Sequence, residues 1–187
     1  MDKLKTLKDL KKNRISLEEK YIVENELMKK LDKLSNSNKN FNQNIINEVV
    51  LFKVNRYAKT DNKILKNLNR IKSTSRKLNK ALTEEVLKEL LQTKGIGLPM
   101  ASTILRFKNP NVYQIIDQRV YRIIYGYTFK NNSSKTDKKI EEKIKVYIKY
   151  LEDLKNVCKT YKIDFFHSDR ILYDLDKEHN KGIKIDY

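Results

Sequence analysis

Gly95 and Gly97 lie between two apolar segments of a chain that has only four glycines and two prolines. Glycine has no Cβ and readily takes a positive φ, so the backbone there can approach a ligand closely. Pro99 follows at a place that suits the first turn of a helix, where its missing N–H costs nothing. The unpaired N–H groups of such a helix start attract an anion. The pattern predicts a helix-hairpin-helix whose turn contacts a nucleic-acid phosphate; a tight turn without a ligand is the alternative.

A contact of this kind involves the nucleic-acid backbone and not the bases, so it positions the protein without giving sequence specificity. We expect it to come from the turn and its neighbours, helped by basic side chains elsewhere. The predicted DNA-binding residues are Thr93, Lys94, Gly95, Ile96, Gly97, Leu98, Arg106, Lys53 and Arg56.

The charge of the chain also indicates an anionic partner. Lys and Arg number 41 against 24 Asp and Glu, which gives a net charge of +17. Between Lys53 and Lys80 there are ten basic residues and a single acid, Asp61. A solvated helical face would explain this block, but its place just before the hairpin favours contact with phosphates.

Helical periodicity dominates the chain and no alternating strand pattern is evident, so we expect an all-α protein. Ser16 and Glu19 form a capping box that opens a helix reaching Leu34. Thr83 is expected to cap the first hairpin helix, Glu84–Gln92. The other expected helices are 45–59, 64–71, the helix that contains Pro99, the helix after residue 117, 140–161 and a last helix opening at Ser168.

The segment after the hairpin resembles a motif of a known protein family. Phe107-Lys108-Asn109-Pro110 is followed by Ile115-Ile116-Asp117-Gln118-Arg119-Val120-Tyr121-Arg122-Ile123. The second of these is similar to the pattern Val-Asp-x-His/Arg-Val-x-Arg-Val that closes the same region in the helix-hairpin-helix (HhH-GPD) DNA glycosylase superfamily. The resemblance covers residues 84–126, and a weaker likeness to the last helix of small relatives covers Asp169–Tyr173.

The resemblance implies a fold and a function. Two helical lobes would flank a DNA cleft, with an N-terminal helical arm (1–34), basic helices joining the second lobe (44–80), a hairpin and catalytic-aspartate lobe (81–127), and C-terminal helices packing with the N-terminal part (137–187). The partner would be double-stranded DNA, from which a damaged or modified base is excised.

Asp117 would then be the catalytic residue, twenty positions after Gly97 as in the family. Cleavage of an N-glycosidic bond builds positive charge on the sugar, and a carboxylate can stabilise that charge and orient or deprotonate the attacking water. Asp is also a favoured helix N-cap, and capping alone remains the alternative.

The resemblance also bears on mechanism and cofactors. Bifunctional relatives carry a Schiff-base lysine where this chain has Pro99, so a monofunctional enzyme is implied unless another lysine reaches the site. The lone Cys158 excludes the four-cysteine iron–sulfur cluster of some relatives. The backbone carbonyls of Leu91, Thr93 and Ile96 match those that can hold a structural Na⁺ or K⁺; no other cofactor is expected.

We expect a cytoplasmic protein, because the chain has no apolar run long enough to cross a membrane and no secretory h-region. We also expect a monomer that is associated with the nucleoid. Two other functions stay open. One is a noncatalytic helix-hairpin-helix DNA-binding protein. The other is a coiled-coil assembly protein using the 140–161 helix, whose apolar positions repeat in steps of three and four, although a helix buried in a globular domain is favoured.

Overall fold

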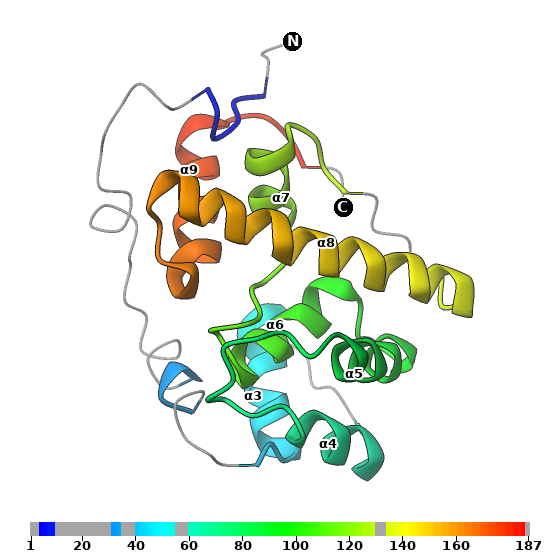
Figure 1. Cartoon of the computed structure of the whole chain (residues 1–187). Helices are drawn as coiled ribbons and strands as arrows, with labels where there is room; N and C mark the ends of the chain where they lie inside the picture. The colour runs from blue at the N-terminus through cyan, green and yellow to red at the C-terminus, as the bar shows by residue number, and fades with distance from the viewer. Residues whose placement is uncertain (1–3, 10–30, 35–39, 55–59, 130–133, 186–187) are drawn as a thin grey trace. The chain divides into compact units, whose positions relative to one another are not determined.

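The computed structural model describes residues 4–9, 31–34, 40–54, 60–129 and 134–185. All regular secondary structure in these ranges is helical (Figure 1), which confirms the all-α expectation for them. None of the described helices combines the length and the apolar character that a membrane crossing requires. Residues 16–30 of the helix expected to open at Ser16 and residues 55–59 of the next one lie outside the described ranges, whereas residues 31–34 are described and helical.

The chain divides into two compact units. Unit 1 comprises residues 1–23, 116–131 and 150–187, and unit 2 comprises residues 24–115 and 132–149. The division at Ile115 falls inside the range 81–127 that was expected to form one lobe. The hairpin therefore belongs to unit 2 and Asp117 to unit 1.

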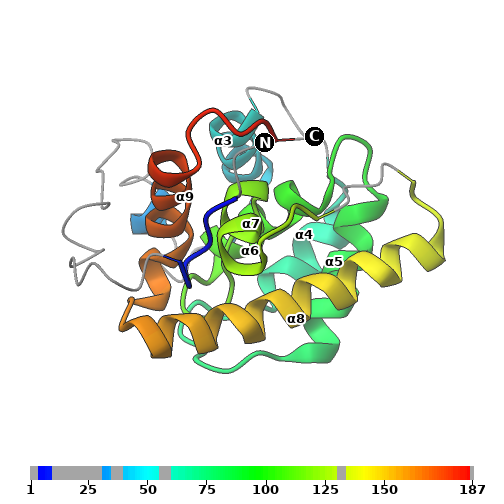
Figure 2. The ribbon, with the colours of Figure 1, turned by 90° about the horizontal axis from the view of Figure 1, so that it is seen from above.

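Unit 2 is built around one buried helix. It contains α3 (Gln43–Val54), α4 (Asn62–Asn69), α5 (Lys80–Gln92), α6 (Leu98–Lys108) and the first residues of α8 (Asp137–Tyr161). Every α6 residue except Pro99 is buried, as expected of a helix that is covered on all sides. Helices α3 and α5 both pack on α6, and α4 packs on α5, beside which it lies in Figure 2.

The start of α5 corrects one expectation. The helix begins at Lys80 and its N-cap is Asn79, whose side chain accepts a hydrogen bond from the Leu82 N–H at 3.1 Å. Thr83, the expected cap, lies in the first turn and is fully buried. Its hydroxyl donates to the Asn79 carbonyl at 2.7 Å and lies 2.8 Å from the Tyr113 hydroxyl. Asparagine is an equally good cap, and Thr83 serves a tertiary contact that local sequence does not reveal.

Unit 1 is held together by the packing of α7 (Gln118–Tyr125) on α9 (Ser168–His179), which lie side by side in Figure 1. A fully buried ion pair joins them. Arg122 donates from Nε to Asp176 Oδ1 at 2.6 Å and from Nη2 to Asp176 Oδ2 at 2.7 Å. This bidentate geometry is the strongest that an arginine and a carboxylate can form.

Further donors complete the coordination of Asp176. Asn180 Nδ2 donates to Oδ1 at 2.8 Å, and Arg119 Nη1 donates to Oδ2 at 3.2 Å. Asn180 in turn exchanges two hydrogen bonds with the backbone of Lys5, at 2.6 and 2.7 Å. The buried charges of unit 1 thus tie the N-terminal segment, α7 and α9 into one network.

The apolar stripe of the long helix α8 is buried inside the protein. Ile140, Tyr147, Leu151, Leu154 and Cys158 are all buried. The favoured interpretation, a helix buried in a globular domain, is confirmed for these positions, since a coiled-coil seam would need them exposed.

We predict that Arg122→Met lowers the free energy of unfolding by about 3–5 kcal/mol, because it leaves the Asp176 charge buried without its main partner. Urea unfolding followed by circular dichroism measures this loss. Arg70→Met is the control, since Arg70 pairs with Glu85 at 2.8 Å at the surface, and exposed pairs contribute about 1 kcal/mol or less. Equal losses for the two variants would contradict the role given to the buried pair.

Candidate functional site

The hairpin turn connects α5 to α6 in unit 2. Helix α5 ends at Gln92, and its C-cap Thr93 donates its N–H to the Leu90 carbonyl at 3.1 Å. Gly95 has a φ of +83°, the left-handed conformation for which glycine is suited. The Ile96 N–H then returns to the Thr93 carbonyl at 3.2 Å, while the Ile96 side chain is buried. The turn is therefore a closed, hydrogen-bonded structure that presents Lys94 and Gly95 to solvent.

Gly97 does not have the positive φ that was expected of the glycines in this turn. Its φ is −100° and its ψ is 178°, an extended conformation open to any residue, so only Gly95 takes a positive φ in this turn. Gly97 is the N-cap of α6, and no side chain caps this helix start. Pro99 lies in the first turn as predicted. The N–H groups that begin α6 are consequently without a side-chain acceptor, which is the arrangement that an anion can use.

The Thr93 carbonyl has a second donor besides Ile96. The ammonium group of Lys135, from the segment that precedes α8, donates a hydrogen bond to it. Thr93 is one of the three residues whose carbonyls were expected to hold a monovalent cation, together with Leu91 and Ile96. Among the described residues, no group of three His, Cys, Asp or Glu side chains is arranged to bind a metal ion.

Asp117 is the N-cap of α7. Its Oδ1 accepts a hydrogen bond from the Arg119 N–H at 2.8 Å, and its carbonyl accepts from the Tyr121 N–H at 2.8 Å. The residue is partly exposed. The capping role is confirmed, and the catalytic role stays a prediction. Because Arg122 fixes α7 through Asp176, the position of the Asp117 carboxylate within unit 1 is fixed as well.

The prediction that Arg106 contacts DNA is wrong. The side chain of Arg106 is 0% exposed, it forms an ion pair with Asp32, and its guanidinium lies 5.1 Å from the centre of the Phe107 ring. Its position on the fully buried helix α6 is the physical reason, since a guanidinium inside the core does not reach a phosphate. Of the other two basic candidates, Lys53 lies half-buried in the last turn of α3, and Arg56 lies outside the described residues.

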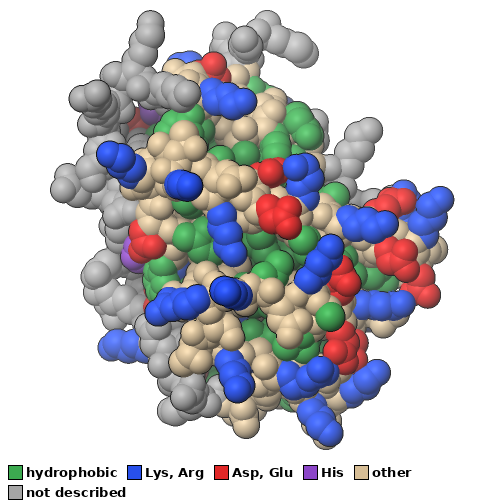
Figure 3. Space-filling view, in the orientation of Figure 1, with side chains coloured by type: hydrophobic (Ala, Val, Ile, Leu, Met, Phe, Trp, Pro, Cys, Tyr) green, Lys and Arg blue, Asp and Glu red, His purple; other side chains and the backbone are tan. Residues whose placement is uncertain are grey.

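The basic block is partly neutralised by α5. Lys63 pairs with Glu89 at 3.2 Å, and Arg70 pairs with Glu85 at 2.8 Å. In Figure 3, Lys and Arg side chains cover the region where Figure 1 draws α4, with acidic side chains among them. Beyond α4, Lys72 and Lys77 are exposed and form no ion pair with any other described residue. Lys66 on α4 and Lys80 at the start of α5 are likewise exposed without an ion pair to a described residue, so part of the uncompensated charge of the block lies in the loop between α4 and α5 and part on the two helices beside it.

That loop is held by asparagine side chains that sequence reasoning did not identify. Asn109 is fully buried, and its Nδ2 donates to the Lys72 carbonyl at 2.8 Å and to the Ser75 carbonyl at 2.9 Å. Asn111 accepts a hydrogen bond from Arg76 and donates to the Ser73 carbonyl at 3.4 Å. The exposed cations of this loop thus project from a fixed backbone.

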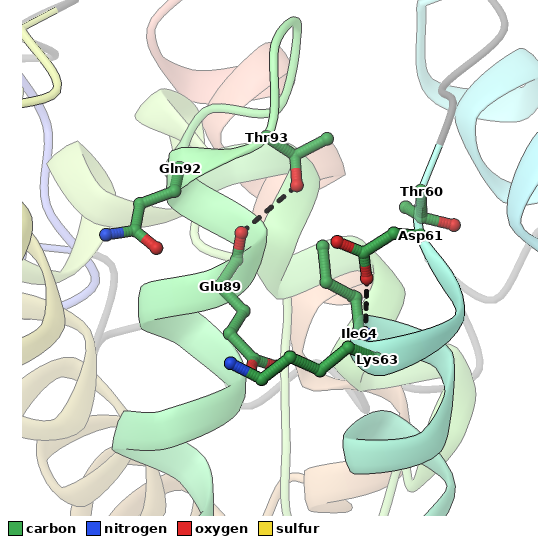
Figure 4. A pocket seen from close by; sticks show the side chains of 7 residues that line it. All are labelled: Thr60, Asp61, Lys63, Ile64, Glu89, Gln92 and Thr93. Atoms are coloured by element: carbon green, nitrogen blue, oxygen red, sulfur yellow. Dashed lines mark hydrogen bonds and ion pairs between the residues drawn. The ribbon is translucent and has the colours of Figure 1, made fainter.

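An open pocket of about 500 Å³ lies between the start of α4 and the end of α5 in unit 2. Figure 4 shows its lining, in which Lys63 points toward Glu89 and the Thr93 hydroxyl donates to the Glu89 carbonyl. The Glu89 carboxylate is occupied by Lys63 and by Asn67 Nδ2, which lies 2.9 and 3.1 Å from its two oxygens. Asp61 caps α4 through the Ile64 N–H at 2.8 Å. Both acids of the pocket therefore have structural partners, and Asp117 is not part of the lining.

Aromatic side chains gather in unit 1 at the C-terminal end of α7. Tyr121 contacts Tyr125, Tyr127 and Phe129, with ring centres 4.3, 5.7 and 5.3 Å away. Burial and the hydrogen-bonded Tyr127 raise the pKa of Tyr121 to about 12. Tyr127 is the most exposed large apolar side chain among the described residues, at 58%. Tyr127 directly follows Gly126, the C-cap of α7.

Comparisons of the chain with models of protein families, with curated proteins and with solved structures found no match.

We predict that Gly95→Ala destabilises the protein by about 1–2 kcal/mol, because an L-residue is strained at a positive φ. Gly97→Ala is the matched control. Its φ is unstrained, and an added Cβ would meet only Pro99 Cδ, at an ordinary contact distance of 3.9 Å. Thermal unfolding of the two variants gives the comparison, and an equal loss at both positions would contradict the turn geometry.

Proposed function

We propose that the protein is a monofunctional DNA glycosylase that hydrolyses the N-glycosidic bond of a damaged or modified base in double-stranded DNA. The observation that carries the proposal is the partly exposed carboxylate of Asp117 at the start of α7, twenty positions after a hairpin that ends in the uncapped start of α6. The resemblance of residues 84–126 to the glycosylase superfamily agrees with this combination.

In the proposed reaction, the hairpin binds the DNA backbone and Asp117 supplies the carboxylate. The N–H groups at the start of α6 hold a phosphate, and the basic residues add salt-dependent affinity. The departing base takes the electrons of the glycosidic bond, which leaves positive charge on the sugar. Asp117 stabilises that charge and accepts a proton from the water that attacks the anomeric carbon. The products are the free base and an abasic site in an unbroken strand.

The position of Pro99 supports the monofunctional form of the reaction. Proline has no amine that could form a Schiff base with the sugar. The abasic strand should therefore break only when alkali is added.

A noncatalytic helix-hairpin-helix DNA-binding protein is the second candidate. The hydrogen bond from the Arg119 N–H to Asp117 Oδ1 favours it, because capping α7 is by itself a sufficient reason for an aspartate at this position. The two candidates share the hairpin contact and differ only in what Asp117 does.

We predict that Asp117→Asn abolishes base excision and leaves DNA binding and stability nearly unchanged. Asparagine caps a helix about as well as aspartate, so the substitution removes the charge and keeps α7 in place. Duplexes carrying a panel of altered bases are incubated with the protein and then treated with hot alkali, and strand breaks are measured on a denaturing gel.

Asp164→Asn is the control for this experiment, because Asp164 caps the short 3-10 helix η1 (Phe165–His167) of the same unit. It should retain activity. Excision that survives in Asp117→Asn would contradict the catalytic role. Binding without excision of any tested base by the unmodified protein would favour the noncatalytic candidate.

We also predict that the double variant Lys72→Ala, Lys77→Ala binds DNA with a weaker salt dependence. Each lost phosphate contact reduces the slope of log K against log salt by about 0.9, so the pair should reduce it by about 2. Lys63→Ala with Arg70→Ala removes the same charge from residues that already pair with acids, and should leave the slope nearly unchanged. Equal slopes for the two double variants would contradict the contact assigned to this loop.

A further inference from the structure

Lys135 brings a positive charge to the hairpin from a distant part of the sequence. It lies in the segment before α8, and its ammonium group donates a hydrogen bond to the Thr93 carbonyl, 42 positions away. Both residues belong to unit 2. Thr93 is the C-cap of α5 and the first residue of the turn, as Figure 4 shows. The charge is therefore placed where the chain enters the hairpin.

The same carbonyl was expected to be one of three that hold Na⁺ or K⁺. A carbonyl oxygen has two lone pairs, and the Thr93 oxygen accepts one hydrogen bond from Lys135 and one from the Ile96 N–H at 3.2 Å. A monovalent cation at the Thr93 carbonyl would have to displace the Lys135 ammonium group, which already brings a positive charge to this oxygen. The position of Lys135 therefore disfavours a metal ion at the donor set that the resemblance implies.

A second lysine lies close to the first. Lys143 donates from Nζ to the Ser134 carbonyl at 2.8 Å. Burial lowers the pKa of Lys143, and the charge of Lys135 lowers it further. Partial desolvation of its ammonium group also lowers the pKa of Lys135, although the residue as a whole is exposed. Among the described residues neither ammonium group forms an ion pair with a carboxylate. Two like charges that repel each other without an acid between them favour the binding of an anion.

We propose that the Lys135 ammonium group takes the place of the monovalent cation at this hairpin, and that it bridges the Thr93 carbonyl to a DNA phosphate. An ammonium has three protons, of which the Thr93 carbonyl takes one. The residue is exposed, so a phosphate can reach the remaining protons. The inference rests on the DNA binding proposed above, and it assigns to the chain itself a charge that would otherwise come from the solution.

The consequence is that the affinity for DNA should not depend on which monovalent cation is present. A hairpin that needs a bound cation binds DNA more tightly in K⁺ or Na⁺ than in a bulky organic cation that carbonyl groups cannot coordinate. A hairpin with a built-in ammonium binds equally in all three at the same ionic strength.

The test measures fluorescence anisotropy of a short fluorescein-labelled DNA duplex in KCl, NaCl and choline chloride at equal ionic strength. The unmodified protein should have the same Kd in all three salts. Lys135→Met should bind about tenfold more weakly in choline chloride, since it loses a charge-assisted hydrogen bond. KCl should restore part of this loss, because the Thr93 carbonyl is then open to K⁺. Lys138→Met removes the same charge three positions later, at the exposed start of α8, and should behave like the unmodified protein.

A second measurement without DNA separates this inference from the proposed function. Thermal unfolding in the same salts should give one Tm for the unmodified protein, and a Tm for Lys135→Met that is higher in KCl than in choline chloride. A K⁺-dependent Kd or Tm in the unmodified protein would overturn the inference, as would unchanged DNA binding in Lys135→Met. Absence of duplex binding in every salt would remove the proposed function and the phosphate bridge, even if the Tm results placed Lys135 as the cation at Thr93.

Discussion

The ion pair between Arg122 and Asp176 is the interaction on which the rest of unit 1 depends. Both side chains are fully buried, and a buried charge is tolerated only while its partner and its hydrogen bonds are in place. The pair therefore admits one arrangement of α7 on α9. Asn180 extends this arrangement to the N-terminal segment, and Asp117 is held at the start of the helix that the pair fixes. A carboxylate that must meet a developing charge needs such a rigid support, since small displacements cost much of the stabilisation.

Unit 2 must hold positive charges in place, as unit 1 holds the Asp117 carboxylate. Its central helix α6 is buried, so the cations that could bind a phosphate must come from the segments around it. Arg106 is turned into the core, and the acids of α5 neutralise part of the basic block. What remains is presented on backbone that other side chains hold: Asn109 fixes the loop after α4, and Lys135 is anchored on the turn itself. Cations on backbone that is already ordered bind an anion without the entropy cost of ordering the loop that carries them.

Most features set by short-range sequence were predictable, except the N-cap of α5 and the φ of Gly97, and features set by distant contacts were not. Helical periodicity, the first-turn position of Pro99 and the capping position of Asp117 depend on neighbouring residues, and the structure confirms them. The motif that contains Arg122 was recognised, but its partner lies 54 positions away and no local pattern indicates it. The same limit explains the wrong prediction for Arg106. Its sequence context suggested a surface cation, but packing around α6 buries it. The contact of Lys135 with Thr93 likewise depends on the tertiary fold alone.

Detection of the released base itself is the most direct test of whether the protein is a DNA glycosylase. A single-turnover incubation of excess protein with duplexes that carry altered bases, followed by mass spectrometry of the small-molecule fraction, identifies any base set free. The proposal predicts one class of free base, an abasic strand that stays intact until alkali is added, and no release by Asp117→Asn. Tight, salt-sensitive binding of the duplexes with no free base from any of them would contradict it, and would make the hairpin and its cations a DNA-binding device alone.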